Sequence, residues 1–559
     1  MASRGVLPQV LAGRLNPRVP SLLARASPFR SQAVLSTSSL YSQRQAPILR
    51  RRYATARDNN DAADQAKDAK EGAEHEGAAN VAADTASKDT QSKQAVLDEA
   101  SGSSASSSTT TLNDTSDWET NVNMNIDSFK QLPHANFGVN QFIPFDPEFR
   151  EVLKQIPWEF RAPIRYAFAY GSGVFPQSKS SGKVISDEEL RKIHPKAPEA
   201  VKRAQDGTPK MIDFIFGVTH TQHWHSLNMK QHRHHYSALA SLGSGAVSYV
   251  QDKMGAGVYF NPYVIVNGIL IKYGVVQLDT LERDLTQWDT LYLAGRLHKP
   301  VKILRDDPKI RLANQINLLS ALRTALLLLP PKFTEDELFA TIAGISYLGD
   351  PRMSLPTENP SKVKNIVGNN MTNFRRLYLP LIETLPNVEY NDASATERDW
   401  IWNDKSLNLL QDMDPVKRGN MVRRLPKAFR SKLYFEYQKK FAIPQLEFNK
   451  MMEESRNEDA VSFKRRQGGG FEQRIASDDP AELRKQVRSV IKQTINWPAT
   501  TQSLKGPLTS GFKRTIRYLS EKMDKYRQGK DAEKAKTAAA TAEEKPSEKS
   551  EVDSKAEKK

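Results

Sequence analysis

The distribution of aromatic residues limits where this chain of 559 residues can form a hydrophobic core. Residues 54–117 contain no Phe, Tyr or Trp and are dominated by Ala, Asp, Ser and Thr. Such a segment cannot bury enough apolar surface to offset a conformational entropy of roughly 1–2 kcal/mol per residue. We therefore expect a disordered spacer over residues 54–128 and a disordered tail over residues 531–559. The foldable remainder, residues 129–530, is long enough for two or three domains.

The first 53 residues differ from the rest in charge. They contain nine Arg and no Lys, Asp or Glu, with short apolar clusters between the Arg residues. This pattern is typical of a mitochondrial presequence, although a disordered basic tail is an alternative. These Arg residues supply more than half of the formal net charge of +16. The remaining chain is therefore only mildly basic and gives little indication of a nucleic-acid partner.

The composition excludes several classes of site. The chain contains no Cys, which rules out a disulfide scaffold, a thiol nucleophile and a thiolate metal site. No apolar run approaches the ~20 residues that a membrane-spanning helix needs. If the protein works at a membrane, we expect it to do so from the surface.

A strand followed by a turn of small residues is the first candidate for a binding site. Residues 165–170 alternate and lead directly into Gly171, Ser172 and Gly173, in a turn that ends near Gln177. Backbone N–H groups in such a turn can approach phosphate oxygens because no Cβ atom is in the way. The turn is neither a Walker loop nor a dinucleotide fingerprint, so an ordinary turn remains an alternative.

Two charged residues interrupt apolar strands. Residues 211–218 are apolar except for Asp213. Because an unpaired buried charge is very costly, Asp213 indicates a metal ligand or an ion pair. An Asn-Gly pair at 267–268 separates two β-branched runs, which predicts a hairpin. Alternation along its second strand places Lys272 and Tyr273 on opposite faces, so Lys272 can meet a phosphate or face solvent.

Histidine is concentrated in one short segment. Six of the ten His lie between residues 220 and 235. A zinc site is one interpretation, but the chain has no HExxH motif and the spacings fit no common zinc motif. Polar contacts to a ligand, or histidines on the surface, are the favoured interpretations.

Seven short motifs follow one another along the chain: YGSGVFPQ, MIDFIFGV, WHSLN, HYS, GAGVYFNP, LIKYGVV and AGRLHKPVKI. In this order they resemble the mitochondrial translocator assembly and maintenance protein family. Members of that family are phosphatidate cytidylyltransferases, also called CDP-diacylglycerol synthases. The resemblance runs from about Asn136 to Tyr526, which is nearly all of the foldable chain.

The resemblance implies an α+β fold. A domain similar to the polymerase-β-type nucleotidyltransferases, with a mixed sheet and flanking helices, would span residues 129–330. A mostly helical, winged-helix-like domain would span residues 331–460, and a C-terminal region residues 461–530. The sequence supports the boundary near 330 because two Pro at 330–331 end an apolar helix, and residues 334–337 form a capping box that opens the next helix.

The resemblance also implies a reaction. The protein would couple CTP to phosphatidate, with Mg²⁺ as cofactor, releasing pyrophosphate and giving CDP-diacylglycerol for cardiolipin synthesis. It would be a peripheral protein on the matrix side of the mitochondrial inner membrane. Two other functions remain: a non-enzymatic factor that maintains the protein-import machinery, and a nucleotidyltransferase that acts on RNA. In the favoured interpretation no nucleic-acid partner is expected, and the sequence does not indicate an oligomeric state.

Residue roles follow from the matching motifs. Gly171 and Ser172 would hold the CTP phosphates, together with Gly173 and Gln177, and Asp213 would bind the metal and act in catalysis. Negative charge develops on the transferred and leaving groups, so nearby cations are expected. The candidates for neutralising pyrophosphate or the lipid headgroup are Lys272, which would act in catalysis, and Arg296 and Lys299, which would bind substrate. The candidates for contacts to cytosine, ribose or phosphatidate are His225, Asn228, His235 and Tyr236.

One position departs from the wider fold. Polymerase-β-type enzymes commonly show Asp-x-Asp on the metal strand, whereas the second position here is Ile215. A further carboxylate must then come from elsewhere, and Asp279 and Asp284 are the candidates. A single ion is the alternative to a two-metal site.

Residues 504–527 are the expected membrane element. Apolar side chains recur there at intervals of four and three residues, which places them on one face of a helix: Phe512, Ile516, Leu519, Met523 and Tyr526. Six Lys and Arg residues surround this stripe. A basic amphipathic helix of this kind is expected to bind the anionic lipids of the inner membrane. A helix docked on the protein core is the alternative.

Overall fold

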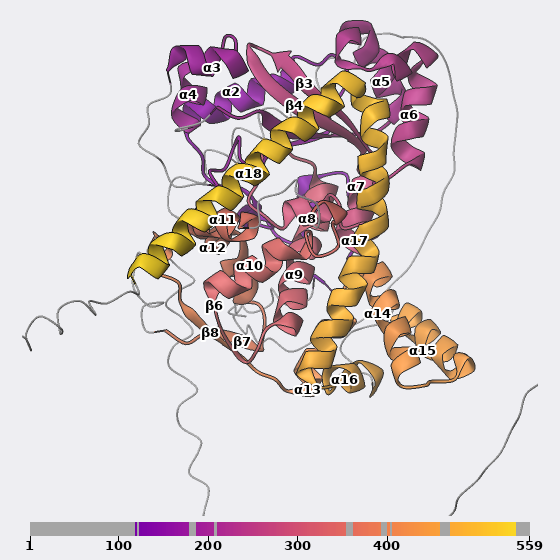
Figure 1. The fold of residues 1–559 in the computed structure, drawn as a ribbon. Coiled ribbons are helices and arrows are strands. Elements are labelled where there is room, and N and C mark those ends of the chain that lie inside the picture. The colour runs from indigo at the N-terminus through magenta and orange to yellow at the C-terminus, as the bar shows by residue number, and fades with distance from the viewer. Residues whose placement is uncertain are drawn as a thin grey trace, which may run out of the picture. The chain divides into compact units, whose positions relative to one another are not determined.

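The computed structural model (Figure 1) describes residues 118–119, 122–177, 186–205, 209–353, 361–392, 400–402, 405–458 and 470–543. The expected presequence 1–53 lies outside the described residues. So do most of the expected spacer and the end of the expected tail.

A five-stranded mixed sheet organises the first half of the described chain. Its strand order is β3-β4-β2-β1-β5; β2 and β4 are parallel, and the other neighbours are antiparallel. The strands are β1 (Tyr166–Tyr170), β2 (Ile212–Val218), β3 (Val258–Val266), β4 (Ile269–Gln277) and β5 (Lys302–Arg305). The mixed sheet expected from the resemblance is thus confirmed. The predicted hairpin is confirmed too, since Asn267 and Gly268 join β3 to β4 with φ angles of 48° and 76°.

Helices pack around this sheet. In Figure 1, α2 (Pro147–Trp158), α3 (Asp187–Ile193) and α4 (Glu199–Ala204) lie to the left of the β3–β4 hairpin, and α5 (Thr221–Gln231) and α6 (Ser244–Lys253) lie to its right. Helices α7 (Leu278–Gln287) and α8 (Ala294–Leu297) lie between β4 and β5 along the chain. The 3₁₀ helices of this half are η2 (Phe129–Gln131), η3 (Val139–Gln141), η4 (Arg233–His235) and η5 (Ala238–Leu242).

Helix α9 (Pro308–Leu328) connects the two halves of the fold. Asp307 caps its N-terminus, and 18 of its 21 residues are buried, so the helix is surrounded by protein on all sides. It ends just before Pro330, as the sequence predicts. One hydrophobic core extends past it from Ile143 to Ala499. The expected boundaries at 330 and 460 therefore do not separate two independent cores, and they stay predictions.

A second, smaller sheet follows α9. Its strands β6 (Lys332–Thr334), β8 (Asn408–Gln411) and β7 (Val388–Tyr390) are antiparallel in that order. Between β6 and β7 the chain forms α10 (Glu335–Ile345), η6 (Pro351–Met353), α11 (Lys362–Gly368) and α12 (Met371–Ile382), and η8 (Trp400–Trp402) precedes β8. The predicted capping box of Thr334 and Glu337 opens α10. This part is mostly helical, as expected, but the small sheet was not predicted, because three- and four-residue strands carry little periodicity.

The C-terminal part is helical. It contains α13 (Pro415–Arg423), α14 (Lys427–Lys440), α15 (Gln445–Glu458), α16 (Gly470–Ala476), α17 (Pro480–Ser510) and α18 (Phe512–Glu543). Figure 1 shows α17 leading up to a bend beside β3 and β4, from which α18 runs back toward α11.

Three expectations about the termini need correction. The single helix expected over 504–527 is wrong, because Gly511, with φ of +83°, separates α17 from α18. The tail expected to be disordered from 531 is wrong up to Glu543, since its Ala, Lys and Glu favour helix and α18 continues to that residue. The spacer expected to reach 128 ends earlier, because Ile126 is buried with Leu132, Phe137 and Leu312.

Candidate functional site

Three neighbouring strands bring the predicted catalytic residues together. On β2, Asp213 lies directly opposite Tyr170 of β1 and Lys272 of β4. Lys272 Nζ donates a hydrogen bond to Asp213 Oδ1 at 2.8 Å, and the two side chains keep 15% and 23% of their surface exposed. Asp213 and Lys272 therefore form an ion pair at the surface of the sheet, where a ligand can reach both charges.

The glycine-rich turn lies against the same carboxylate. Gly171 follows Tyr170 with φ of +83°, and a Cβ atom on it would lie 3.1 Å from Asp213 Oδ2. A Cβ atom on Gly173 would lie 2.7 Å from the carbonyl oxygen of Met211. Both positions therefore require glycine. The structure thus places the predicted nucleotide-binding residues Gly171 and Gly173, and Ser172 between them, beside Asp213.

Gln177, the fourth residue predicted to bind nucleotide, lies at the end of this turn and is half-buried. The carbonyl of the preceding Pro176 accepts a hydrogen bond from Asn370 Nδ2 at 2.9 Å, which connects the end of the turn to the N-terminus of α12.

Arg296 reaches the site from α8. Its Nε donates to the Tyr170 hydroxyl at 3.3 Å, and its guanidinium lies 4.0 Å from the centre of the Tyr292 ring. Lys299 is directed elsewhere, because its Nζ donates to Ser346 Oγ at 2.9 Å and lies 5.1 Å from the centre of the Tyr347 ring. Of the two predicted cations after the sheet, Arg296 is brought next to the Tyr170–Asp213 pair, and Lys299 joins α8 to the end of α10.

Two residues of the site were missed by the sequence analysis. The ring centre of Tyr518, on α18, lies 5.6 Å from Lys272 Nζ. Arg352, on η6, pairs with Asp350 at 2.5 Å and contributes to the electrostatic environment of Tyr518. Nothing local in the sequence could have identified them, because each is far from Asp213 along the chain and is brought there by tertiary packing.

Neighbouring charges shift protonation at the site. Burial opposes the charge on Lys272, but the Asp213 carboxylate beside it raises the pKa of the Lys272 ammonium above its usual range. Burial would raise the pKa of Tyr518, whereas the cations Lys272, Lys522 and Arg352 lower it to about 8. The surroundings of Tyr518 are therefore strongly cationic, as a site for phosphate groups requires.

The expected second carboxylate is not at this site. Val218 pairs with Gln277 at the far end of β2 and β4, and Asp279 follows that end in the first turn of α7. At about 3.3 Å per residue, the strands carry Asp279 roughly 15–20 Å beyond Lys272. Its side chain is 76% exposed. Asp279 therefore cannot share an ion with Asp213.

Asp284, the other candidate, has a structural role. It is buried and accepts five hydrogen bonds from residues 290–294. These bonds fix the loop before α8, and they leave the carboxylate committed to the protein's own N–H and O–H groups.

The four predicted substrate contacts form a buried network instead. His225 bonds to Tyr236 and Gln251 at 2.9 and 2.8 Å, and Asn228 Nδ2 donates to the hydroxyls of Tyr236 and Tyr273. His235 bonds to the same Tyr273 hydroxyl at 3.0 Å. Because Tyr273 and Lys272 point to opposite faces of β4, this network lies on the other face from Asp213. The expected contacts of His225, Asn228, His235 and Tyr236 to the substrate at that site are therefore wrong.

The same histidines are poor proton carriers at neutral pH. Burial lowers the pKa of His225 to about 4 and that of His235 to about 3. Both imidazoles are thus neutral. His225 joins α5 to Tyr236 and to Gln251 on α6, and His235 joins η4 to Tyr273 on β4.

A histidine cluster on η4 is close enough in space to suggest a metal site. The ligand nitrogens of His232, His234 and His235 lie within 4.8 Å of one another. The rings of His232 and His235, however, are stacked with an interplanar angle of 5° and centres 4.5 Å apart. A metal ion must lie in the plane of each imidazole that binds it, and two stacked parallel planes share no such point. His232 and His235 therefore cannot bind one zinc ion together.

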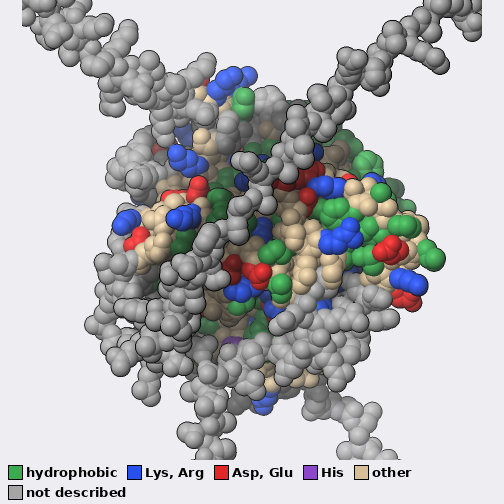
Figure 2. Space-filling model, turned by 90° about the horizontal axis from the view of Figure 1, so that it is seen from below, with side chains coloured by type: hydrophobic (Ala, Val, Ile, Leu, Met, Phe, Trp, Pro, Cys, Tyr) green, Lys and Arg blue, Asp and Glu red, His purple; other side chains and the backbone are tan. Residues whose placement is uncertain are grey.

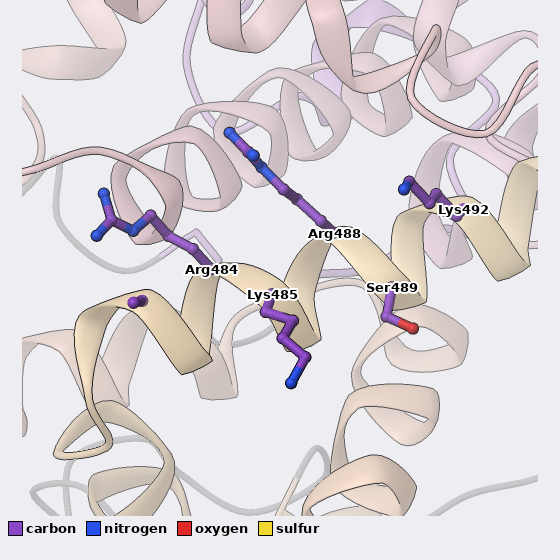
Figure 3. A pocket seen from close by; sticks show the side chains of 6 residues that line it. Arg484, Lys485, Arg488, Ser489 and Lys492 are labelled. Atoms are coloured by element: carbon purple, nitrogen blue, oxygen red, sulfur yellow. The ribbon is translucent and has the colours of Figure 1, made fainter. Parts of the chain in front are cut away.

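A hollow of about 450 Å³ lies on α17, away from these residues. Figure 3 shows Arg484, Arg488 and Lys492 projecting from one side of the helix, and Lys485 and Ser489 from another. No residue predicted for the site lines this hollow. It is a basic surface separate from Asp213.

Charges of both signs are mixed on one face of the molecule. Figure 2 shows the face seen from below, where the coloured Lys and Arg side chains lie among Asp, Glu and hydrophobic side chains. The coloured part of this face lacks the single-signed surface that RNA binding favours. Among the described helices, none combines the length and the apolarity that crossing a membrane requires.

Comparison with known proteins agrees with the resemblance found in the motifs. The family model for "Phosphatidate cytidylyltransferase, mitochondrial" matches residues 153–525. Proteins of that name from Schizosaccharomyces pombe and Mus musculus are both 34% identical to this chain, over 69% and 67% of it and over 86% and 95% of their own length. The protein of that name from Saccharomyces cerevisiae is 42% identical over 47% of this chain and 63% of its own length.

These names support neither of the two alternatives, the import factor and the RNA-directed enzyme. The expected assignment is confirmed, and the chain belongs to the family of mitochondrial phosphatidate cytidylyltransferases.

Proposed function

We propose that the protein transfers CMP from CTP to phosphatidate, giving CDP-diacylglycerol and pyrophosphate. The observation that carries this proposal is the contact between the Gly171 turn and Asp213, with Lys272 Nζ 2.8 Å from the same carboxylate. A glycine turn, a carboxylate and a lysine at one point provide N–H donors for phosphates, a metal ligand and a neutralising charge.

The proposed reaction requires little proton transfer by the protein. A phosphatidate oxygen attacks the α-phosphorus of CTP and forms a new P–O bond. The bond from that phosphorus to the bridging oxygen of the β-phosphate breaks, and its electron pair leaves with pyrophosphate. Since a phosphate monoester is already largely ionised at neutral pH, no strong general base is needed. Positioning and charge stabilisation are the protein's main contributions.

Each site residue has a role in that scheme. The backbone of Gly171, Ser172 and Gly173 binds the CTP phosphates, and Gln177 lies at the end of the same turn. Lys272 and Arg296 neutralise the charge that develops on the leaving pyrophosphate. Arg296 is oriented for this by its hydrogen bond to Tyr170.

The residues present fit Mg²⁺ as the cofactor. Asp213 Oδ1 is engaged by Lys272, while Oδ2 faces the turn where phosphates would bind. One carboxylate together with substrate phosphates and water is a common way to hold Mg²⁺. When bound, the ion would polarise the phosphoryl oxygens and lower the barrier to attack. Because Asp279 lies too far away and Asp284 is committed to hydrogen bonds within its own loop, we favour a single protein carboxylate, Asp213, as ligand.

We further propose that the two sheets belong to a nucleotidyltransferase domain and a winged-helix unit. The unit of β6, α10–α12, β7 and β8 packs against the first sheet's helices, because the Tyr378 hydroxyl donates to the His298 carbonyl at 2.8 Å and Lys299 donates to Ser346. These contacts support a role in enclosing the site rather than in binding DNA.

We also propose that the C-terminal helices contact the inner membrane from the matrix side, and the exposed apolar side chains of these helices support a membrane contact. Phe512, Ile516, Leu519 and Met523 are 43–74% exposed along one side of α18, and Leu504 and Leu508 continue the exposed apolar surface on α17. On the other side of α18, Arg514 donates to the carbonyls of His234 and His235. The helix is thus both docked on the protein and able to present an apolar stripe to lipid.

The reaction is tested with the mature protein, CTP and phosphatidate. We expect CDP-diacylglycerol and pyrophosphate to form in equal amounts, and EDTA to abolish turnover until excess Mg²⁺ is restored. Turnover that persists after complete chelation would contradict the metal assignment, and no product under any condition would contradict the reaction itself.

The membrane contact is tested with vesicles. Replacing Phe512 and Ile516 by Ser should release the protein from cardiolipin-containing vesicles while leaving CTP binding intact, because both side chains point away from the protein. Unchanged sedimentation with vesicles would place the anchor elsewhere.

A further inference from the structure

Two aromatic rings face the Lys272 ammonium. Its Nζ lies 4.9 Å from the centre of the Phe260 ring on β3 and 5.6 Å from the centre of the Tyr518 ring on α18. A cation within about 6 Å of a ring centre is attracted by the ring's quadrupole. The rings and the Asp213 carboxylate, which come from three separate parts of the chain, therefore fix the position of this ammonium group.

Helix α18 is held at this place by contacts around Tyr518. Arg514 donates to the carbonyls of His235 and His234 at 2.7 and 2.8 Å, one helical turn before Tyr518. The guanidinium of Arg517 lies 4.5 Å from the centre of the Tyr263 ring on β3. These contacts anchor the helix to η4 and β3, so the position of Tyr518 does not depend on its contact with Lys272.

The ring contacts matter because the Asp213 carboxylate, besides pairing with Lys272, is also the proposed metal ligand. A lysine side chain has a long, flexible stem, and its ammonium stays in one place only while its partners hold it. A metal ion bound to Asp213 Oδ2 would draw on the negative charge of the same carboxylate and so weaken its attraction for Lys272. The Tyr518 and Phe260 rings do not bind that ion, so they continue to hold Lys272 when the ion is present.

We propose that Tyr518 is a positioning residue for the reaction, whose ring holds the Lys272 ammonium facing the phosphates of the bound substrates. The C-terminal helix is then part of the active site, and anchoring is not its only role. This inference rests on the proposed role of Lys272 in phosphoryl transfer.

The experiment uses the full chain with CTP, Mg²⁺ and a short-chain phosphatidate in detergent, so that vesicle binding is not required. Tyr518→Leu keeps an apolar side chain on the helix but removes the ring, and we expect kcat to fall about tenfold, with the KM for CTP little changed. Tyr518→Phe keeps the ring and should retain most of the wild-type kcat. Tyr249→Leu, the same change at a 65% exposed tyrosine on α6, is the matched control and should leave kcat unchanged.

A double-variant comparison shows whether Tyr518 acts through Lys272. In a Lys272→Met background, Tyr518→Leu should lower kcat no further, because the ammonium it holds is gone. A further tenfold loss there would overturn the proposal, and so would full kcat in the single Tyr518→Leu variant. Equal losses in Tyr518→Phe and Tyr518→Leu would assign the effect to the hydroxyl group instead of the ring.

Failure of this inference and failure of the proposed function are distinguishable. If the function is wrong, the wild-type protein forms no CDP-diacylglycerol. If only the inference is wrong, the wild type is active and one of the outcomes above is observed. Thermal unfolding of each variant, with and without CTP, separates a local effect on Lys272 from loss of the folded helix.

Discussion

Two carboxylate–cation pairs in this molecule have the same length but very different surroundings. Glu335 and Arg375 in the second half are 2.8 Å apart, and both side chains are 0% exposed. Asp213 and Lys272 are also 2.8 Å apart, but both remain partly exposed. We refer to them as the enclosed pair and the open pair.

The enclosed pair has partners on every side. Glu335 also accepts hydrogen bonds from the Leu407 N–H and the Tyr390 hydroxyl. Arg375 also donates to the backbone carbonyls of Trp400, Ile401 and Lys405. Together these bonds hold α10, α12, β7 and the approach to β8. A buried ion pair satisfied in this way acts as one structural unit, and removing either partner leaves an uncompensated charge.

The open pair, in contrast, remains accessible to a ligand. Its carboxylate lies against a glycine turn, and its ammonium lies against two rings. Among the described residues, neither charge is covered by a network of backbone donors or acceptors like the one around Glu335. The difference teaches that an ion pair can mark a binding site when both of its charges remain partly exposed.

The largest expected effect is on turnover, from breaking the open pair. Asp213→Asn removes the negative charge that would hold the metal ion, and we expect turnover to fall by about three orders of magnitude, since metal assistance is worth several kcal/mol. The melting temperature should change little, because the pair is partly solvated. The matched control is Asp279→Asn, at a carboxylate 76% exposed at the far end of the sheet, which should retain activity. Undiminished turnover in Asp213→Asn would remove this residue from the mechanism.

The next effect is on stability, from breaking the enclosed pair. Arg375→Met leaves Glu335 buried without its cation, and we expect the free energy of unfolding to fall by about 3–5 kcal/mol. Replacing Glu335 by Met as well should restore part of that loss, because no buried charge then remains unpaired. Urea unfolding measures both variants. Protein that is still folded should retain turnover at low temperature. A stable but inactive Arg375→Met variant would contradict the purely structural role of the enclosed pair.

The open pair was largely predictable from the sequence, and the enclosed pair was not. Asp213 and Lys272 are recognisable in the sequence because each is a charged residue within an apolar strand. The hairpin pattern also predicts which face of the sheet Lys272 occupies. Glu335 is different, because it follows the Thr334 cap and so resembles any acidic residue in the first turn of a helix. Its burial depends on Arg375, which lies 40 residues away along the chain.

The errors at the site have physical causes. Asp279 is only seven residues after Lys272 in the sequence. The chain between them is mostly an extended strand, which rises by about 3.3 Å per residue, so the two residues are far apart in space. His225, Asn228, His235 and Tyr236 are polar residues in matched motifs, and the sequence cannot separate a buried hydrogen-bond network from a set of ligand contacts. Tyr518, on α18, is far from Asp213 along the chain, and only tertiary packing brings it to the site.

The smallest expected effect comes from Gly171→Ala, which alters the turn beside the open pair without removing either charge. Gly171→Ala puts a Cβ atom 3.1 Å from Asp213 Oδ2 at a φ of +83°. We expect a loss of about 1–2 kcal/mol in the free energy of unfolding, as for a non-glycine residue in the left-handed region, and a raised KM for CTP. Gly344→Ala, at a helical position with open space around it, is the matched control and should gain roughly 0.5–1 kcal/mol. If Gly171→Ala were as stable and as active as the wild type, the turn could not be in contact with the carboxylate, and the open pair would have to bind its ligands without it.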